Sequence, residues 1–463
     1  MFGEGPKEAC GLVGVWAPGE DVSRLLYFGL YALQHRGQES AGIAVSDGHD
    51  ILVYRELGLV SQVFDERTLS TLHGDLGVGH TRYSTTGSTT WDNAQPTFKT
   101  DGTRGVALGH NGNLVNTVEL AERVGRRGPA TTDSDLVATL LSTESADLET
   151  AALRVLPTLK GAFSFVLMDE RTVYGARDPH GLRPLAIGRL GSGWVLASET
   201  AALDIVGAAY VREVEPGELV SIDERGLRSM RFADTPRHAL CLFEFVYLAR
   251  ADSRLYGESV HEARREMGRR LARSAPAPAD LTIPVPDTGH SAAAGYAEAS
   301  GIPYGEGLIK NRYVHRTFIE PTPALRQRGV RLKLNPLADT IRGRRLAVVD
   351  DSIVRGTTTR QIVQMLRDAG AAEVHMRITS PPIRWPCYYG IDMPTREELV
   401  ASAMSVDEIR DFIGADSLAY LSLDELVAAT GAPRDAFCRA CFDGAYPVAV
   451  PDRAPSKGLL ERD

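Results

Sequence analysis

Cysteine is scarce in this sequence, and long hydrophobic runs are missing from it. Only five of the 463 residues are cysteine, and no stretch approaches the ~18 apolar residues that a membrane-spanning helix needs. The first nine residues are too polar and too few for a secretory signal, which requires a cationic start and an apolar run. We therefore expect a cytoplasmic protein with reduced thiols and no membrane partner.

Basic residues are also fewer than acidic residues. Lys and Arg total 51 against 60 Asp and Glu, and the net charge of −9 argues against a general nucleic-acid partner. Apolar residues make up 43% of the chain and charged residues 24%, which is typical of a globular protein. The length exceeds what one hydrophobic core supports, so two or three domains are expected.

The rhythm of predicted elements changes along the chain. From 10 to about 230, short strand patterns and turn residues alternate with helical patterns, which predicts layered sheets covered by helices. From about 260 to 380, strands alternate with helices, which predicts a doubly wound parallel sheet. Expected strands in the first region are 51–54, 105–109, 163–168, 193–197 and 217–222, and expected helices are 22–34, 135–141 and 148–156.

The most specific stretch is VVDDSIVRGTTT, residues 348–359. An apolar strand delivers Asp350 and Asp351 to its carboxyl end, where ligands bind in open α/β sheets. Gly356 permits a tight turn before a threonine run that opens the next helix, a favourable place for a phosphate. A capped turn is the simpler interpretation, but the paired acids favour a site for ribose hydroxyls or a hard cation such as Mg²⁺.

This stretch resembles the signature of type I phosphoribosyltransferases, which use phosphoribosyl pyrophosphate (PRPP). The resemblance implies that the acid pair holds the ribose and the metal side of PRPP, and that PVPDTG, residues 284–289, binds pyrophosphate with Thr288 near Mg²⁺. It also implies a flexible loop over the substrate in the basic stretch 310–335, although a solvated charged face is the usual role of such a run. The PRPP-binding residues implied are Lys310, Asp350, Asp351, Ser352, Arg355, Gly356, Thr357, Thr358 and Thr359.

Four short segments in the first region together supply the chemical groups that glutamine hydrolysis requires. Cys10 offers a thiol, although a lone cysteine in a strand is more often a buried apolar residue. Arg82 in HTRYSTTG can pair with a carboxylate, and Asp133 in TTDSD can hold an ammonium group. The Asn111 amide and the Gly112 N–H in GHNGNL are two donors of the kind that forms an oxyanion hole.

This set resembles the N-terminal-nucleophile glutamine amidotransferases, in which the cysteine must be the first residue of the mature chain because its own α-amine is the base. A free α-amine and a thiol have neighbouring pKa values, near ~7.7–8.0 and ~8.5, so proton exchange between them is reasonable. The resemblance therefore implies that residues 1–9 are a propeptide removed after Ala9.

Both halves in this order resemble the amidophosphoribosyltransferase family over nearly the whole chain. LQHRGQESAG (33–42), KNRYVHRTFI (310–319) and YGIDMPTREELVA (389–401) also fit that family. The implied architecture is an N-terminal-nucleophile hydrolase sandwich of α-β-β-α layers in 10–235, followed by a doubly wound type I phosphoribosyltransferase domain in 236–463. The implied reaction converts glutamine, PRPP and water into 5-phosphoribosylamine, glutamate and pyrophosphate, with feedback inhibition by purine nucleotides and a homotetrameric assembly.

The four cysteines besides Cys10 form a second group. Cys438 and Cys441 are a Cys-x-x-Cys pair, a spacing used by zinc sites, redox pairs and iron–sulfur clusters, and Cys241 and Cys387 complete the number that a closed thiolate site needs. Spacing does not choose between zinc and iron. One branch of the family, which also carries the propeptide, has a 4Fe–4S cluster on four such cysteines, and the resemblance implies that cluster here.

Two other classes of protein share part of these features. A glucosamine-6-phosphate synthase shares the N-terminal machinery, but its sugar isomerase half lacks VVDDSIVRGTT. A non-enzymatic regulator that binds PRPP would need no Cys10 site and would normally carry a DNA-binding helix-turn-helix, which the sequence does not show. Pyrophosphate release from glutamine, PRPP and Mg²⁺ separates the three.

Overall fold

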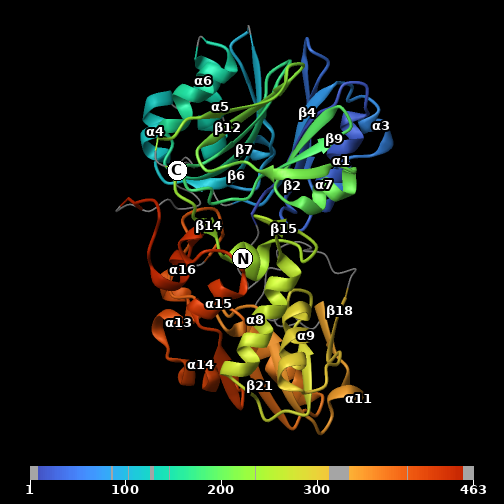
Figure 1. The fold of residues 1–463 in the computed structure, drawn as a ribbon, viewed down its shortest axis with the longest axis vertical. Coiled ribbons are helices and arrows are strands. Elements are labelled where there is room, and N and C mark those ends of the chain that lie inside the picture. Colours follow the sequence, from blue (N-terminus) through green and yellow to red (C-terminus); the bar gives the residue numbers. More distant parts are fainter. Residues whose placement is uncertain are drawn as a thin grey trace.

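The computed structural model describes residues 9–84, 87–102, 104–125, 130–144, 146–234, 236–311, 333–393 and 395–451. They form two lobes joined end to end, one from the N-terminal half of the chain and one from the C-terminal half (Figure 1).

The N-terminal lobe holds two antiparallel sheets. Within the described ranges these are a seven-stranded sheet in the order β11-β9-β10-β1-β4-β2-β3 and a six-stranded sheet in the order β13-β12-β8-β7-β6-β5. The strands of the first are β1 (Gly11–Trp16), β2 (Ser40–Ser46), β3 (Ile51–Leu57), β4 (Leu76–Arg82), β9 (Ala186–Leu190), β10 (Gly193–Ala197) and β11 (Ala209–Glu213). Those of the second are β5 (Thr97–Thr100), β6 (Gly105–Leu114), β7 (Gly161–Met168), β8 (Val173–Arg177), β12 (Glu218–Asp223) and β13 (Gly226–Arg231).

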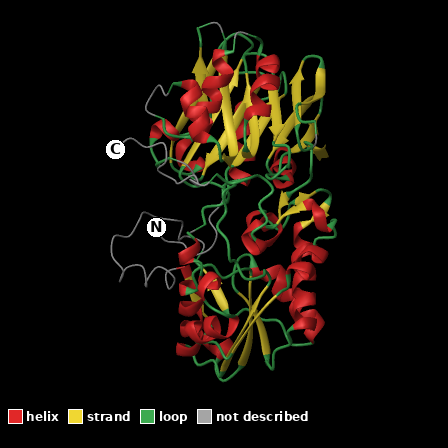
Figure 2. Cartoon of the chain, turned by 90° about the vertical axis from the view of Figure 1, so that its left-hand side faces the viewer, coloured by secondary structure: helices red, strands yellow, loops and turns green. Residues whose placement is uncertain are grey.

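Helices cover the outer face of each sheet. Apolar side chains of α1, α2, α3 and α7 pack on the first sheet, and those of α4, α5 and α6 pack on the second. Between the sheets lies a core that includes Leu12, Val166 and Leu196. The layers therefore follow the expected α-β-β-α order (Figure 2). The helices are α1 (Val22–Ala32), α2 (Val60–Val63), α3 (Glu66–Leu69), α4 (Thr117–Val124), α5 (Asp133–Thr143), α6 (Leu148–Val155) and α7 (Thr200–Val206).

The first helix, α1, shows how local sequence sets these elements. The Asp21 carboxylate accepts a hydrogen bond from the Arg24 N–H at 3.2 Å and so caps the amino end. Val22, Leu26 and Leu30 recur every four residues, and this spacing places them on one buried face against the sheet.

The C-terminal lobe is built on a parallel sheet in the order β17-β20-β21-β22. Alternate residues of β20 face opposite sides: Ala347 and Val349 pack toward α8 and α9, while Leu346 and Val348 pack toward α12 and α14. This is the doubly wound arrangement that the sequence predicts. The elements are β17 (Leu281–Pro284), β20 (Arg345–Asp350), β21 (Glu373–Ile378), β22 (Ser417–Tyr420), α8 (Val260–Ser274), α9 (Gly289–Ser300), α12 (Thr357–Asp368) and α14 (Val406–Ile413).

Short elements complete this lobe and its junction with the other. They are β14 (Leu240–Cys241), β15 (Arg254–Leu255), β16 (Glu258–Ser259), β18 (Leu308–Lys310), β19 (Leu334–Pro336), α11 (Ala338–Ile341), α13 (Val400–Ala403), α15 (Leu423–Ala429), β23 (Phe437–Cys438) and α16 (Ala440–Asp443), with a π-helical turn over Glu244–Leu248. The parallel pairing of β14 with β23 ties the segment before α8 to the C-terminal segment.

Buried ion pairs also join the lobes. Glu244 accepts from Arg36 at 2.6 Å and from Arg183 at 3.4 Å, and Arg36 additionally pairs with Glu199. All four side chains are 1% exposed or less, so the lobes meet through a dry, charge-neutral network.

One expected strand is longer than its pattern predicts. The 105–109 strand continues to Leu114, so Asn111 and Gly112 lie inside β6, because β7 pairs with β6 as far as Leu114. Arg82 is the last residue of β4 and is 2% exposed, because β1 and β2 flank that strand.

Candidate active sites

Cys10 lies immediately before β1, at the edge where β1 meets β4. Its thiol donates to the Tyr83 carbonyl at 3.4 Å, and the Tyr83 N–H points back to the sulfur at 3.5 Å. The pairing of Gly11 with Thr81 fixes this position, because it sets Cys10 beside the end of β4. Ala9, just before it, is buried, and residues 1–8 of the expected propeptide lie outside the described residues.

A small cavity opens beside the Cys10 sulfur. It brings together four of the five predicted glutaminase residues from β1, β4, β6 and the start of α5. The lining comprises Cys10, Arg82, Tyr83, Gln95, His110, Gly112, Thr132, Asp133 and Ser134.

The fifth predicted residue, Asn111, is fully buried and does not line this cavity, although its chain neighbours His110 and Gly112 do. Neither amide atom of its side chain has a hydrogen-bond partner among the residues that the structure describes. A buried amide costs free energy when it is unpaired, so such a group points to a ligand. Gly112 has φ +147°, and a Cβ there would lie 2.1 Å from the Ala162 oxygen, so only glycine fits this position.

The pKa values of the two titratable groups in the cavity shift in opposite directions. Burial raises the pKa of the Cys10 thiol to about 11, because its effect outweighs the lowering by the Tyr83 N–H and by Arg82. Burial alone would also raise the pKa of Asp133, but His110 and the N–H groups of Leu114 and Ser134 bring it below its usual range. Asp133 is therefore an anion at neutral pH, and the thiol is protonated.

Several residues that support this site were not predicted from the sequence. The His110 N–H donates to the Gln95 side chain at 2.8 Å, and Gln95 donates to Ser134 at 3.1 Å. Glu39 lies 3.8 Å from Arg82 and accepts from the Ser84 N–H at 2.9 Å. Glu39 falls within LQHRGQESAG, and His110 precedes Asn111, so the quoted motifs contained two of them without showing their roles.

The second site lies at the carboxyl end of β20. Asp350 and Asp351 are both 8% exposed, and the Thr288 hydroxyl, just before α9, donates to Asp351. Ser352 donates to the other oxygen of Asp351 at 2.5 Å. Burial, followed by the neighbouring Asp351, raises the pKa of Asp350 well above its usual range, and burial also raises that of Asp351. Such an acid pair favours a bound cation.

The predicted phosphate loop follows the acids. Gly356 has φ +79° and is the N-cap of α12, so Thr357, Thr358 and Thr359 form the first turn of that helix. The Thr357 hydroxyl is buried without a partner in the described part of the chain, whereas Arg355 pairs with Glu398 at 3.0 Å.

Lys310, at the end of β18, forms an ion pair with Asp287, the residue before Thr288. This contact brings Lys310 to the same edge as the acid pair. Most of the expected flexible loop, residues 312–332, lies outside the described residues.

The four remaining cysteines converge from three segments. Cys241 and Cys438 are register partners of β14 and β23, and the Arg384 N–H donates to the Cys441 carbonyl at 3.0 Å, which brings the segment before Cys387 to the same place. Burial and the neighbouring thiols raise the pKa values of Cys241, to about 12, and of Cys438 and Cys441. Across the described ranges, no three His, Cys, Asp or Glu side chains are arranged to hold a single metal ion.

The segment after Cys387 contacts the first site. Asn113 donates to the Tyr388 carbonyl at 3.1 Å, and the Tyr83 hydroxyl donates to Asp392 at 3.0 Å. Gly390 packs directly against the backbone of Gly112, where a Cβ would be 2.8 Å from the Gly112 carbonyl carbon. One segment of the C-terminal half thus reaches β6, the strand that carries the predicted oxyanion-hole residues.

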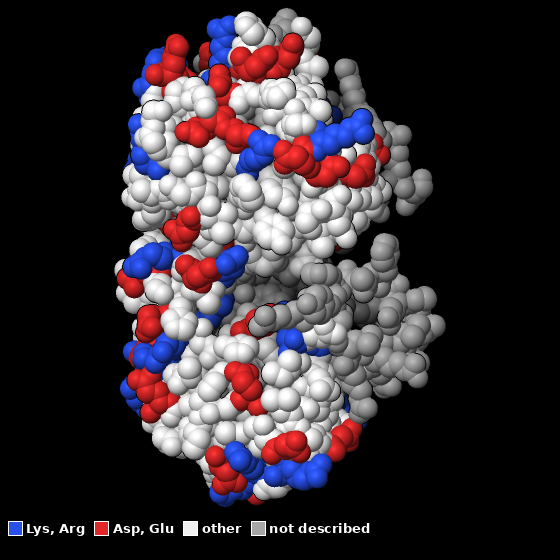
Figure 3. All heavy atoms as spheres, turned by 90° about the vertical axis from the view of Figure 1, so that its right-hand side faces the viewer, with Lys and Arg blue, Asp and Glu red and all other residues white. Residues whose placement is uncertain are grey.

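The surface adds two observations. One face is hollowed between the lobes, and Lys and Arg side chains are interspersed with Asp and Glu over the described surface in that view (Figure 3). Within the described ranges, no helix combines the length and apolar character needed to cross a membrane.

Comparison with known proteins connects the two sites. The model of a glutamine amidotransferase domain matches residues 80–205. Amidophosphoribosyltransferases of Mycobacterium tuberculosis and Synechococcus elongatus are 59% and 53% identical to this chain over 98% of it, covering 90% and 95% of their own lengths. That of Bacillus subtilis is 46% identical over 96% of each chain.

Solved structures agree. One described as the allosteric regulatory enzyme of purine biosynthesis superposes with a TM-score of 0.92 at 45% identity, covering 98% of this chain and 99% of its own. The Bacillus subtilis glutamine PRPP amidotransferase in complex with ADP and GMP superposes with a TM-score of 0.91 at 45% identity, over 97% and 99%. At this identity and coverage, the chain belongs to the amidophosphoribosyltransferase family.

Proposed function

We propose that the two lobes divide the family's reaction between them, with residues 10–235 as the glutaminase domain and 236–463 as the phosphoribosyltransferase domain. The chain is an enzyme of purine biosynthesis by its family, and the assignment of steps to residues is the proposal. The observation that carries it is the cavity where Cys10, Arg82, Gly112 and Asp133 meet beside the unpartnered Asn111 amide.

In the first step, glutamine binds with its α-carboxylate at Arg82 and its α-ammonium at the anionic Asp133. The Cys10 sulfur attacks the side-chain amide carbon, and the oxyanion accepts hydrogen bonds from Asn111 and the Gly112 N–H. The C–N bond then breaks, ammonia leaves with the thiol proton, and water hydrolyses the thioester to glutamate. Ammonia displaces pyrophosphate from C1 of PRPP to give 5-phosphoribosylamine.

Removal of residues 1–9 would supply the base for this step. With the Ala9–Cys10 bond intact, the thiol has a pKa of about 11, and no amine is free to accept its proton. Cleavage would place an α-amine with an ordinary pKa near ~7.7–8.0 beside the sulfur. A chain expressed to start at Cys10 should therefore be alkylated by a glutamine analogue at neutral pH, and the full-length chain should react only after its intact mass shows loss of residues 1–9.

The second site fits Mg²⁺ and PRPP. Mg²⁺ is usually held by one or two carboxylates together with substrate phosphates, and Asp350, Asp351 and the Thr288 hydroxyl are the groups that would hold it. The acids would bind the ribose, and the first turn of α12 would bind the 5′-phosphate. The ion would offset the negative charge of the leaving pyrophosphate, and Lys310 would lie on the same side.

The four-cysteine site would take a 4Fe–4S cluster, as the family resemblance implies. All four donors are thiols, the ligands that hold such clusters. Cys241, Cys387 and Cys438 each act on the pKa of Cys441, which indicates that the four thiols lie near one another. Cys241, Cys387, Cys438 and Cys441 would hold the cluster, which would tie β14 to β23.

The proposed regulation follows a relative: the Bacillus subtilis protein was solved with ADP and GMP, so purine nucleotides are the proposed feedback inhibitors here. The proposed assembly is the homotetramer that the family resemblance implies. The reduced thiols of Cys10 and the cluster favour the cytoplasm.

The test of the proposal compares two nitrogen sources. Wild-type protein with PRPP and Mg²⁺ should release pyrophosphate with glutamine or with ammonia, whereas blocking Cys10 with a glutamine analogue should remove only the first. Loss of both activities on blocking Cys10 would contradict a two-site enzyme.

A further inference from the structure

Arg183 is a buried arginine that the reaction does not use, and it lies in the loop between β8 and β9 at the junction of the lobes. Its side chain is 1% exposed. The carbonyl of the preceding residue, Leu182, accepts a hydrogen bond from the Cys241 N–H at 3.1 Å. The backbone that carries Arg183 is therefore bonded directly to one of the four cysteines.

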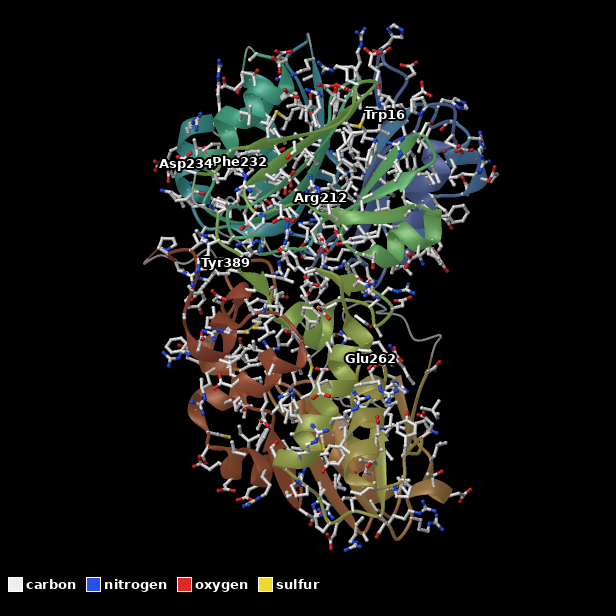
Figure 4. All side chains as sticks on the ribbon, viewed as in Figure 1. Trp16, Arg212, Phe232, Asp234, Glu262 and Tyr389 are labelled. Carbon is white, nitrogen blue, oxygen red and sulfur yellow. The ribbon has the colours of Figure 1, made fainter. Side chains whose placement is uncertain are left out.

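Its guanidinium reaches a second cysteine through Tyr389. Nε and Nη2 donate to the Tyr389 carbonyl at 3.1 and 2.8 Å, a fork that fixes the direction of that carbonyl. The Tyr389 N–H in turn donates to the Cys387 sulfur at 3.4 Å. Tyr389 lies where the two lobes meet (Figure 4). Arg183 thus holds the residue whose N–H bonds a thiolate donor.

Arg183 also brings a buried positive charge to this place. Its guanidinium lies 3.4 Å from Glu244, and both side chains are 1% exposed or less.

We propose that Arg183 is the positioning residue of the four-cysteine site: its fork holds Tyr389, whose N–H is donated to Cys387, and its charge offsets the negative charge of the ligating cysteines. Hydrogen bonds to ligating sulfurs and nearby charges are the means by which a protein sets the potential and stability of an iron–sulfur cluster. The inference rests on the proposed cluster. It adds that the N-terminal lobe supplies a residue on which the cluster depends, although all four ligands come from 236–463.

The chain offers a matched control, Arg177. It is as buried as Arg183, and its guanidinium also donates to backbone carbonyls, those of Val214 and Gly181, each at 2.6 Å. Its electrostatic partners are Tyr256, Glu213 and Asp178 rather than cysteines. Arg177→Met therefore reproduces the cost of losing a buried arginine while leaving the Arg183 contacts with Tyr389 and Glu244 in place.

The experiment compares wild type, Arg183→Met, Arg183→Lys and Arg177→Met, all purified without oxygen. Iron and sulfide per chain, the visible spectrum, the midpoint potential and the rate of bleaching in air are measured. Arg183→Met should bleach about 10-fold faster than wild type and show a more negative potential. Arg183→Lys should have a midpoint potential close to that of wild type, because lysine retains the charge. It should still bleach faster than wild type, because lysine cannot form the fork. Arg177→Met should match wild type in both.

A second variant keeps the test decisive if Arg183→Met does not fold. Glu244→Gln removes the negative charge beside Arg183 and should move the potential in the positive direction. Equal behaviour of Arg183→Met and Arg177→Met, or no shift in Glu244→Gln, would overturn the role of Arg183 while the cluster stands. Wild-type protein without iron would overturn both, and pyrophosphate release measured alongside shows whether the two catalytic sites survive that result.

Discussion

The two proposed catalytic sites differ in how complete they are without their substrates. The Cys10 cavity lies between strands and a helix start, and the amide of Asn111, the chain neighbour of the lining residue Gly112, has no partner among the described residues. At the end of β20, by contrast, Asp351 is already bonded to Thr288 and Ser352, and burial raises the pKa values of both acids. The first site therefore keeps a space beside its thiol, whereas in the second an acid is already bonded to neighbouring side chains.

The difference follows from the two architectures. Antiparallel strands place Cys10 and Arg82 side by side through pairing, so the geometry is rigid. In the parallel sheet, the functional residues lie in loops after β17 and β20, where groups from separate loops can rearrange around a ligand. Variants in the first site should therefore fail in one reaction only, and variants in the second should fail whatever the nitrogen source.

Cys10→Ala tests this separation with the largest expected effect. Glutamine-dependent synthesis should fall by about 10⁴-fold or more, because no other group can form the thioester. Synthesis from ammonia should stay within about twofold of wild type, since the acid pair is untouched. Pyrophosphate release measured with each nitrogen source checks the result, and a parallel loss of both activities would contradict it.

Asp350→Asn and Asp351→Asn probe the other site. Each should reduce synthesis from either nitrogen source by about 10²-fold, because Mg²⁺ and the ribose lose a carboxylate. Cys10 should still be alkylated by a glutamine analogue at the wild-type rate. Asp339→Asn, at an exposed position on α11, is the control and should be fully active. Wild-type turnover in both variants would show that Asp350 and Asp351 are not part of the site.

Asn111→Ala isolates the oxyanion hole within the first site. Loss of one such donor costs about 10²–10³-fold in turnover, so glutaminase activity should fall by that factor with little change in glutamine KM. Synthesis from ammonia should be retained. If KM rises instead and kcat is unchanged, Asn111 contributes to ground-state binding and not to the transition state.

The sequence was sufficient to predict the positions of residues that stand in short motifs. Cys10, Arg82, Gly112 and Asp133 each stand in a short motif, and the structure brings all four to one cavity. The β20 acids and the α12 threonines were likewise predicted, because a strand, a turn and a helix start lie within one stretch.

Contacts between residues that are far apart in the sequence could not be predicted. The contact of Arg36 with Glu244 spans 208 residues and that of Arg36 with Glu199 spans 163, so no local pattern announces them. Gln95 supports His110 only because β5 and β6 pair in one particular register. The pairing of β6 with β7 likewise extends the expected 105–109 strand through Asn111 to Leu114, since tertiary contacts outweigh the local preference of Asn and Gly for turns.

Stability, rather than activity, is expected to change at Glu213, where the lobes meet. This carboxyl is fully buried at the end of β11 and accepts the N–H of Tyr256 at 3.2 Å, and burial raises its pKa from 4.5 to about 7. The folded protein therefore keeps a proton there that the unfolded chain releases above about pH 4.5. The stabilisation is present below that pH and is lost as the pH rises through about 7.

Glu213→Gln keeps the acceptor and cannot ionise, so it reproduces the protonated state at every pH. Near pH 8.5 the variant should be more stable than wild type by up to about 3 kcal/mol, and the difference should vanish toward about pH 4.5. Thermal unfolding of both proteins at several pH values measures this, with Glu215→Gln, at a partly exposed carboxyl nearby, as a control that should show no such trend. A constant difference across the pH range would mean that Glu213 is ionised in the folded protein and that Arg177 compensates for its burial.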